Sequence, residues 1–131
     1  MIKAFILTIF SFCLFLNPTR SQKLDTDIVF AYICKVGIKH PEIVIRQALL
    51  ETGNFKSPYL MNKNNLFGFK HNTYLSFNSW KESVEYYKKW QDKRYKNDKE
   101  DYYTFLVRIK YARSTAYISK LKKFTYTNSC K

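Results

Sequence analysis

The stretch from Pro41 to Gly53 reads Pro-Glu-Ile-Val-Ile-Arg-Gln-Ala-Leu-Leu-Glu-Thr-Gly, and it predicts the central helix of the fold. Proline is tolerated in the first helical turn because the N–H that it lacks would have no partner there. Glycine is the preferred residue just past a helix end, so Gly53 marks the stop. Glu51 then falls in the last turn. The apolar face of this helix consists of Ile43, Val44, Ala48 and Leu49.

Four further helices are predicted from the spacing of apolar residues. The clearest starts at Ser79-Trp80-Lys81-Glu82, a capping-box pattern in which serine is the N-cap and glutamate follows three residues later. Gly37 provides a stop for the first helix of the chain. The four are a helix over 24–36, the helix from Ser79 to a charged linker at 94–100, a helix over 102–109, and a last helix that Ser114 or Thr115 caps.

One part of the sequence suits β structure. Leu66–Phe69 and Tyr74–Phe77 flank a polar tip, as in a short hairpin, whereas residues 54–65 are polar and turn-like. The chain of 131 residues has only three Gly and three Pro, which argues against an all-β sandwich with many hairpins. The expected fold class is α+β and mainly α, with five helices around one very short β-hairpin lobe.

The N-terminus has the pattern of a secretory signal peptide. A basic start at Lys3 precedes an apolar run over residues 4–16 and a polar exit over 17–21. The run is short for a membrane span, which needs about 20 apolar residues. We therefore predict a signal peptide over 1–21, an exported protein, and one domain over 22–131, with a retained N-terminal anchor as the alternative.

Three cysteines are present, and Cys13 lies in the predicted signal peptide. The predicted mature chain keeps Cys34 and Cys130, an even number in an exported and oxidising setting. A disulfide between them would tie the first helix to the C-terminus. Two unpaired thiols are the alternative at this level.

The chain is strongly basic, with 23 Lys and Arg against 10 Asp and Glu. Without residues 1–21 the net charge is about +11, which indicates an anionic partner. No nucleic-acid-binding motif is present, and the basic residues are too scattered for a membrane-active amphipathic helix. Metal-ligand spacing and a glycine-rich phosphate loop are also lacking. We expect a monomer without metal or cofactor that binds an anionic cell wall, more weakly as salt rises.

Glu51 is the candidate for chemistry because of its place on the central helix. Its neighbours on the same face, at i−3, i−4 and i−7, are Ala48, Gln47 and Val44. Partial desolvation and the negative end of the helix dipole both disfavour the anion, so the pKa of Glu51 should rise. A carboxyl group that is protonated near neutral pH suits a general acid for a glycosidic leaving group. A solvated glutamate at a helix end is the alternative.

Two blocks of sequence extend this interpretation. One runs over 47–57 and contains Leu-Glu-Thr-Gly, and the other runs over 64–70 and contains Asn-Leu-Phe-Gly. Together they resemble the N-acetylglucosaminidases of glycoside hydrolase family 73, peptidoglycan hydrolases of the lysozyme-like superfamily. The resemblance spans roughly His40 to Leu121. It implies a lysozyme-like helical domain that cleaves the β-1,4 bond between N-acetylglucosamine and N-acetylmuramic acid in peptidoglycan glycan strands.

The resemblance also implies roles for individual residues. Glu51 matches the catalytic acid, and Tyr117 matches a tyrosine near it, so both are candidate catalytic residues. The family's Tyr-Ala-Thr-Asp-Pro-x-Tyr segment reads Tyr-Ala-Arg-Ser-Thr-Ala-Tyr over 111–117, so its Thr-Asp-Pro core is missing. Core packing is the alternative for the aromatic candidates. The implied substrate-binding residues are Gln47, Asn65, Phe67, Gly68 and Tyr111.

A second catalytic carboxylate is not evident. No Asp or Glu occurs between Glu51 and Glu82, where many members of the family carry one. An inverting glycosidase needs a base about 6.5–9.5 Å from the acid, and a retaining one needs a nucleophile at about 5 Å. We therefore expect the substrate's 2-acetamido group to act as nucleophile, oriented by Tyr117, with Glu82 or Glu85 as alternative bases. The alternative function is a catalytically weak, glycan-binding relative.

Overall fold

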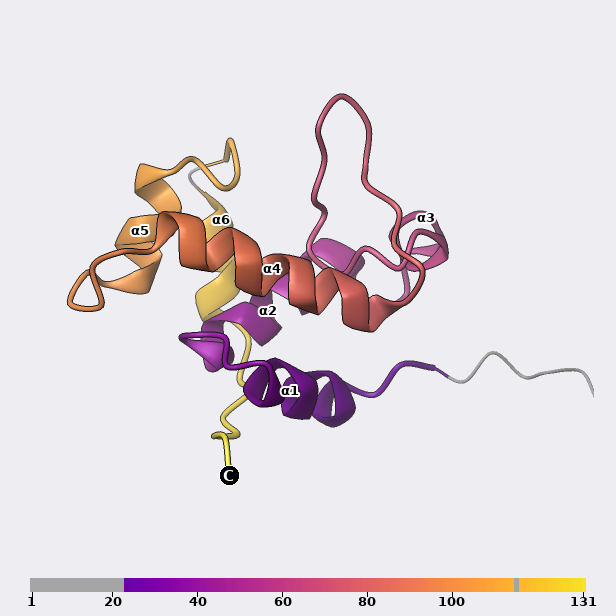
Figure 1. Cartoon of the computed structure of the whole chain (residues 1–131), viewed down its shortest axis with the longest axis horizontal. Helices are drawn as coiled ribbons and strands as arrows, with labels where there is room; N and C mark the ends of the chain where they lie inside the picture. Colours follow the sequence, from indigo (N-terminus) through magenta and orange to yellow (C-terminus); the bar gives the residue numbers. More distant parts are fainter. Residues whose placement is uncertain (1–22, 115) are drawn as a thin grey trace, which may run out of the picture.

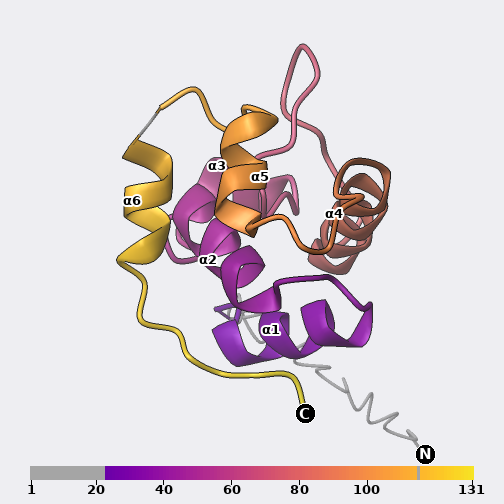
Figure 2. The ribbon, with the colours of Figure 1, turned by 90° about the vertical axis from the view of Figure 1, so that its left-hand side faces the viewer.

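Six helices form the part of the chain that the computed structural model describes, residues 23–114 and 116–131. The predicted signal peptide over 1–21 lies outside these residues. Helix α2 contacts both α1 and α6, and α1 also contacts α4 (Figure 1, Figure 2). The prediction of a mainly α domain is confirmed. The helices are α1 (Thr26–Lys35), α2 (Pro41–Thr52), α3 (Pro58–Asn62), α4 (Trp80–Arg94), α5 (Tyr102–Arg108) and α6 (Ala116–Lys122).

Helix α2 begins and ends where the sequence predicts. Pro41 occupies its first turn, and Gly53 closes it with φ +56°, a left-handed conformation that costs glycine little. Seven of its twelve residues are buried, because α1 and α6 cover it on two sides. Burial of this helix holds its last turn, and with it Glu51, in a fixed position at the edge of the core.

The predicted cap of α4 forms, with one difference in its partner. The Ser79 hydroxyl accepts from the Glu82 N–H at 3.3 Å, as in a capping box. The Glu82 carboxylate reaches one residue further back than in the usual motif and accepts from the Asn78 N–H at 2.9 Å. The carboxylate therefore has a structural role at the start of α4.

The predicted hairpin over 66–77 is a loop, and no strand forms among the described residues. Its two arms meet at one antiparallel bridge between Lys70 and Tyr74. The Leu75 N–H also donates to the Phe69 carbonyl at 2.9 Å. Two short strands without a third partner are only marginally stable in water, which explains why the β lobe is reduced to a single bridge.

Helix α3 lies in the region that the sequence analysis expected to be a turn. It has only five residues, with Pro58 in its first turn and Leu60 as its buried residue. A helix this short offers less than two turns, so the spacing of its apolar residues carries no helical signal. Its position orders the chain between α2 and the loop that begins at Asn65.

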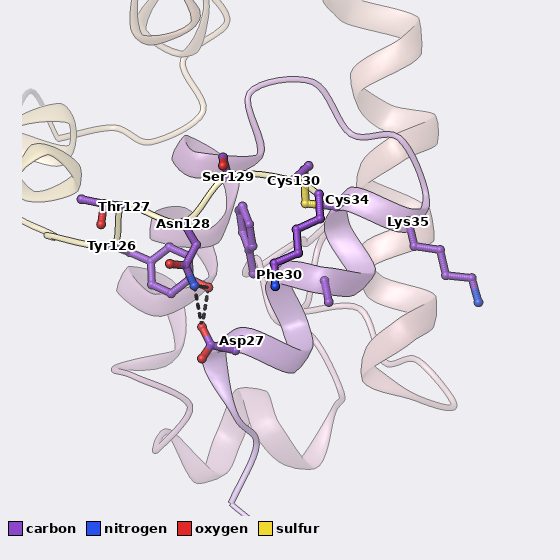
Figure 3. A pocket seen from close by; sticks show the side chains of 11 residues that line it. Asp27, Phe30, Cys34, Lys35, Tyr126, Thr127, Asn128, Ser129 and Cys130 are labelled. Atoms are coloured by element: carbon purple, nitrogen blue, oxygen red, sulfur yellow. Dashed lines mark hydrogen bonds between the residues drawn. A yellow bond between two sulfur atoms is a disulfide. The ribbon is translucent and has the colours of Figure 1, made fainter.

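The C-terminal tail crosses α1 and is bonded to it. Cys34 on α1 and Cys130 form the predicted disulfide, 96 residues apart in the chain. Figure 3 shows the tail beside α1, where Tyr126 and Asn128 both donate to one oxygen of Asp27, at 2.6 and 3.0 Å. The disulfide and these hydrogen bonds hold the two ends of the described domain together.

None of the helices among the described residues is long and apolar enough to cross a membrane.

Candidate active site

Glu51 lies in the last turn of α2 and its carboxyl group is largely buried. Burial raises the pKa of Glu51 above its usual value, and a hydrogen bond with the Tyr117 hydroxyl offsets part of that rise. The direction of the shift agrees with the sequence argument. The carboxyl group is therefore an acid that keeps its proton to higher pH than an exposed glutamate does.

Gly68 lies against the carboxyl group of Glu51. A Cβ atom built on Gly68 would stand 2.7 Å from Oε2 of Glu51, and the glycine has φ +66°. Any other residue would both strain the backbone and collide with the carboxylate. This contact joins the block with Leu-Glu-Thr-Gly, which contains Glu51, to the block with Asn-Leu-Phe-Gly, which contains Gly68.

A cleft of about 470 Å³ opens beside Glu51. Its walls come from the loop over 66–77, from α4, and from the segment over 109–113 that follows α5. The loop and this segment stand on the same side of the molecule (Figure 1). Among the described residues that line the cleft, Glu51 is the only one with a carboxylic side chain. The aromatic residues of the lining are Phe67, Phe69, Tyr74, Trp90 and Tyr111.

Tyr111 and Phe67 connect the two walls of the cleft. The Tyr111 hydroxyl donates to the Phe67 carbonyl at 2.9 Å, so it fixes the backbone immediately before Gly68. The Phe67 side chain is 1% exposed and packs against Tyr87 with ring centroids 4.6 Å apart. Phe67 therefore anchors the loop in the core, while Tyr111 holds the loop at its correct distance from Glu51.

Tyr117 contacts Glu51 from the core side and is not part of the cleft lining. Its hydroxyl accepts a hydrogen bond from Gln47 Nε2 at 3.4 Å and also contacts the Glu51 carboxyl group. Burial and the nearby carboxyl group raise the pKa of Tyr117 far above its usual value, so it stays neutral and can donate. This placement suits a positioning role toward Glu51.

Gln47 is fully buried, and the structure does not place it in the cleft. Its Oε1 accepts from the Tyr87 hydroxyl, which in turn contacts the Tyr102 hydroxyl at 2.6 Å. Gln91 Nε2 donates to Tyr102 at 3.0 Å. Glu51 therefore stands at one end of a chain of buried polar groups that begins with Tyr117 and crosses the core.

Sequence reasoning missed this network. Tyr87 and Gln91 are one turn apart on α4 and look like ordinary members of an amphipathic helix. A signal was nevertheless available, because glutamine at a core position of an apolar helix requires buried hydrogen-bond partners. Gln47 has that position on α2.

Asn65 is fully buried and organises the loop from within. Its Nδ2 donates to the carbonyls of Phe69 and Leu75, at 2.8 and 2.9 Å, and its Oδ1 accepts from the Phe69 N–H at 3.0 Å. All three bonds are to the backbone of the loop over 66–77. The structure thus brings Glu51, Phe67, Gly68 and Tyr111 together at the cleft, and places Gln47, Asn65 and Tyr117 behind them.

The comparison with known proteins agrees with this geometry. The family described as Glucosaminidase, mannosyl-glycoprotein endo-beta-N-acetylglucosaminidase, matches residues 29–129. The match includes Glu51, the loop with Gly68, and Tyr117. The chain belongs to this family. The resemblance to glycoside hydrolase family 73 is thereby confirmed, and the protein is an endo-β-N-acetylglucosaminidase. No curated protein and no solved structure matches the chain significantly.

Two other carboxylates of this glucosaminidase were candidates for a second catalytic group. Glu82 is engaged at the start of α4, and Glu85 accepts from the Tyr32 hydroxyl on α1. Neither is among the residues that line the cleft. Among the described residues, the cleft of the glucosaminidase therefore has one acid and no partner carboxylate.

A larger hollow of about 800 Å³ lies between α1 and the C-terminal tail (Figure 3). Its acidic side chain, Asp27, is held by Tyr126 and Asn128, as described above. Asp27 is exposed, so the described lining of this hollow offers no buried carboxyl group. The smaller cleft is therefore the candidate site, because the largely buried carboxyl group of Glu51 meets it.

Within the described residues, no three His, Cys, Asp or Glu side chains come together in a way that could hold a metal ion. The arrangement at the cleft can supply a proton, fixed backbone groups and aromatic surface. Those are the elements of acid-assisted glycoside cleavage.

Proposed function

We propose that this glucosaminidase hydrolyses the β-1,4 bond between N-acetylglucosamine and N-acetylmuramic acid in peptidoglycan, with Glu51 as general acid. The observation that carries the proposal is the environment of the Glu51 carboxyl group. It is partly desolvated, has a raised pKa, and meets a cleft through the close contact with Gly68. A glycosidic oxygen seated in the cleft would receive the proton as its bond to the anomeric carbon breaks.

The acetamido group of the substrate is the proposed nucleophile. Its carbonyl oxygen attacks the anomeric carbon of the same sugar as the C–O bond to the leaving sugar breaks, which forms an oxazolinium ion. The Glu51 carboxylate then accepts a proton from the water that opens this ring. The route needs one protein carboxyl group, which agrees with the cleft lining among the described residues. Tethering of the nucleophile to the reacting carbon supplies its proximity.

Tyr117 and Gln47 are proposed to position the acid. The Tyr117 hydroxyl contacts the Glu51 carboxyl group, and Gln47 holds that hydroxyl from the other side. Direct orientation of the substrate by Tyr117, expected from the sequence, has less support because Tyr117 is buried behind the cleft lining. Asn65 is proposed to act in the same indirect way, by shaping the loop.

The disulfide and the family point to an extracellular protein. We propose that residues 1–21 are a signal peptide removed on export and that the mature enzyme is a monomer. Mass determination of the secreted protein would locate the cleavage site. An intact N-terminus would contradict the removal of residues 1–21.

Mass spectrometry of muropeptides after digestion tests the bond assignment. A new reducing end on N-acetylglucosamine is expected, and a reducing end on N-acetylmuramic acid would contradict the assignment. The Glu51→Gln variant should lose at least about 10²-fold in rate, the low end of a general acid's contribution. Near-normal activity in that variant would show that another group is the acid.

A further inference from the structure

Four cations line the cleft beside the one carboxylic acid. Lys70 comes from the loop over 66–77, Arg94 from the end of α4, and Lys110 and Arg113 from the segment after α5. All four are exposed. None of them takes part in an ion pair with another described residue. We call this set the cationic rim.

Two members of the cationic rim are held against aromatic rings of the same cleft. The Arg94 guanidinium lies 5.4 Å from the centre of the Trp90 ring. The Lys70 ammonium lies 5.5 Å from the centre of the Tyr74 ring. Cations in such positions keep their charge exposed to a ligand while the ring restricts the side chain. The rings therefore restrict two of the four charges to positions beside the cleft.

Lys110 occupies a backbone conformation that normally belongs to glycine. It has φ +55° just past the end of α5, where its N–H donates to the Val107 carbonyl. Helices α1 and α2 place Gly37 and Gly53 at the corresponding left-handed positions. A lysine there is strained, because its Cβ crowds the backbone. The lysine therefore keeps its charge at the cleft at a cost in backbone strain.

We propose that the cationic rim selects glycan strands that carry carboxylates beside the scissile bond. The inference rests on the proposed function and adds a substrate preference to it. Muramic acid bears a lactyl group whose carboxyl group is either free, as a carboxylate, or linked through an amide bond to a peptide that has carboxylates of its own. Exposed ion pairs are individually weak, but four charges of one sign around a cleft raise the local concentration of an anionic ligand.

The test compares three substrates at 50 and 500 mM NaCl. They are peptide-bearing glycan strands, strands whose peptides have been removed by an amidase, and a neutral β-1,4-linked N-acetylglucosamine hexamer. The readout is the ratio of kcat/KM on a strand to kcat/KM on the hexamer. We expect the wild-type ratio to fall at high salt, because salt screens exposed charges.

The decisive variant replaces every member of the cationic rim by glutamine, and we call it the fourfold variant. Its substitutions are Lys70→Gln, Arg94→Gln, Lys110→Gln and Arg113→Gln. Its ratio at 50 mM NaCl should be about 10-fold below that of the wild type. The matched control removes the same charge away from the cleft. It carries Gln at four exposed lysines, namely Lys35, Lys81, Lys99 and Lys123. The control should keep the wild-type ratio, and equal losses in both variants would overturn the proposal.

The Lys110→Gly variant distinguishes a role of this lysine in substrate selection from a role in stability. Because glycine relieves the left-handed strain, the melting temperature should rise, while the substrate ratio should fall. A ratio that is unchanged in both this variant and the fourfold variant overturns the proposal.

The substrates also locate the carboxylate. A preference confined to amidase-treated strands, in which the lactyl carboxylate is free, assigns it to the lactyl group. A preference confined to peptide-bearing strands assigns it to the peptide, and a preference for both kinds of strand shows that either carboxylate is recognised. An equal wild-type kcat/KM on the strands and on the hexamer would overturn the proposed selection and leave the proposed function standing. If the enzyme cuts none of the three substrates, both the proposed function and the proposed selection are overturned.

Discussion

Gly68 and Glu51 are in contact so close that a Cβ on the glycine would stand 2.7 Å from Oε2 of the glutamate. The contact joins the last turn of α2 to the loop over 66–77. The Gly68 backbone borders the carboxyl group on that side, in the space that a side chain would otherwise occupy. A glycine at this position is therefore part of the acid's geometry as well as of the loop.

Gly68→Ala should damage activity more than stability. The added methyl group would displace the carboxyl group of Glu51, and a misplacement near 1 Å costs about 10²-fold in rate. The left-handed φ adds about 1–3 kcal/mol of strain to the folded state. Turnover of peptidoglycan and a thermal melt measure the two effects.

Gly53→Ala is the matched control. Gly53 has φ +56°, but a Cβ built there meets no atom within 4 Å. It should lose a similar amount of stability and keep its rate. Equal rate losses in the two variants would show that backbone strain, and not the contact with Glu51, explains the effect of Gly68→Ala.

The raised pKa of Glu51 makes stability depend on pH. Burial raises it above the usual value of 4.5, so the folded chain keeps the proton at pH values where the unfolded chain has lost it. The stabilising contribution is complete below the unfolded pKa and is lost as pH rises through the folded pKa. We therefore expect the melting temperature of wild type relative to Glu51→Gln to fall as the pH rises above the usual pKa of 4.5. A constant difference would contradict this pKa shift.

Tyr117→Phe should move the pH profile of the reaction upward. The Tyr117 hydrogen bond lowers the pKa of Glu51, so its removal raises that pKa and shifts the alkaline limb of kcat/KM to higher pH. The rate should also fall, because Glu51 loses a positioning contact. Tyr103→Phe, which removes a hydroxyl bonded to Arg46 elsewhere on α2, should leave the limb in place. If the alkaline limb of kcat/KM stays at the same pH in Tyr117→Phe, the hydrogen bond between Tyr117 and Glu51 is ruled out.

The disulfide should contribute to stability and leave the chemistry alone. Bridging residues 96 apart, it closes a loop for which the chain-entropy model gives about 4.7 kcal/mol. Replacing Cys34 and Cys130 by Ser should lower the free energy of unfolding by a few kcal/mol in a urea titration. Activity below the melting temperature should persist, because neither cysteine lines the cleft. Two titratable thiols in the unfolded, unreduced mature protein would show that no bridge forms.

Local signals were sufficient to predict α2 and the place of Glu51 in its last turn. Pro41 and Gly53 mark the ends of the helix, and Glu51 follows from the apolar face between them. The direction of its pKa shift needed only burial and the helix dipole. The cap at Ser79 was equally readable, because a capping box is a contact between residues close in the chain.

What the sequence did not show depends on contacts between distant residues. The 2.7 Å approach of Gly68 to Glu51 arises only when the loop packs on α2. Gln47 was expected at the substrate, but its partner Tyr87 is 40 residues away in the chain. The two apolar segments around a polar tip suggested a hairpin, but a loop forms there. Its backbone is held by side-chain hydrogen bonds from Asn65 in place of a strand ladder.

The stereochemistry of the product tests the absence of a second carboxylate. Glu82 and Glu85 are both hydrogen-bonded outside the cleft, so neither is placed to activate a water against the far face of the sugar. Attack by the acetamido oxygen followed by water gives two inversions and net retention, so the β-anomer should form first. Proton NMR of fresh product distinguishes the anomers before they equilibrate. An α-anomer that forms first would mean direct attack by water, and the base would then have to come from a group outside the described cleft lining or from a rearranged Glu82 or Glu85.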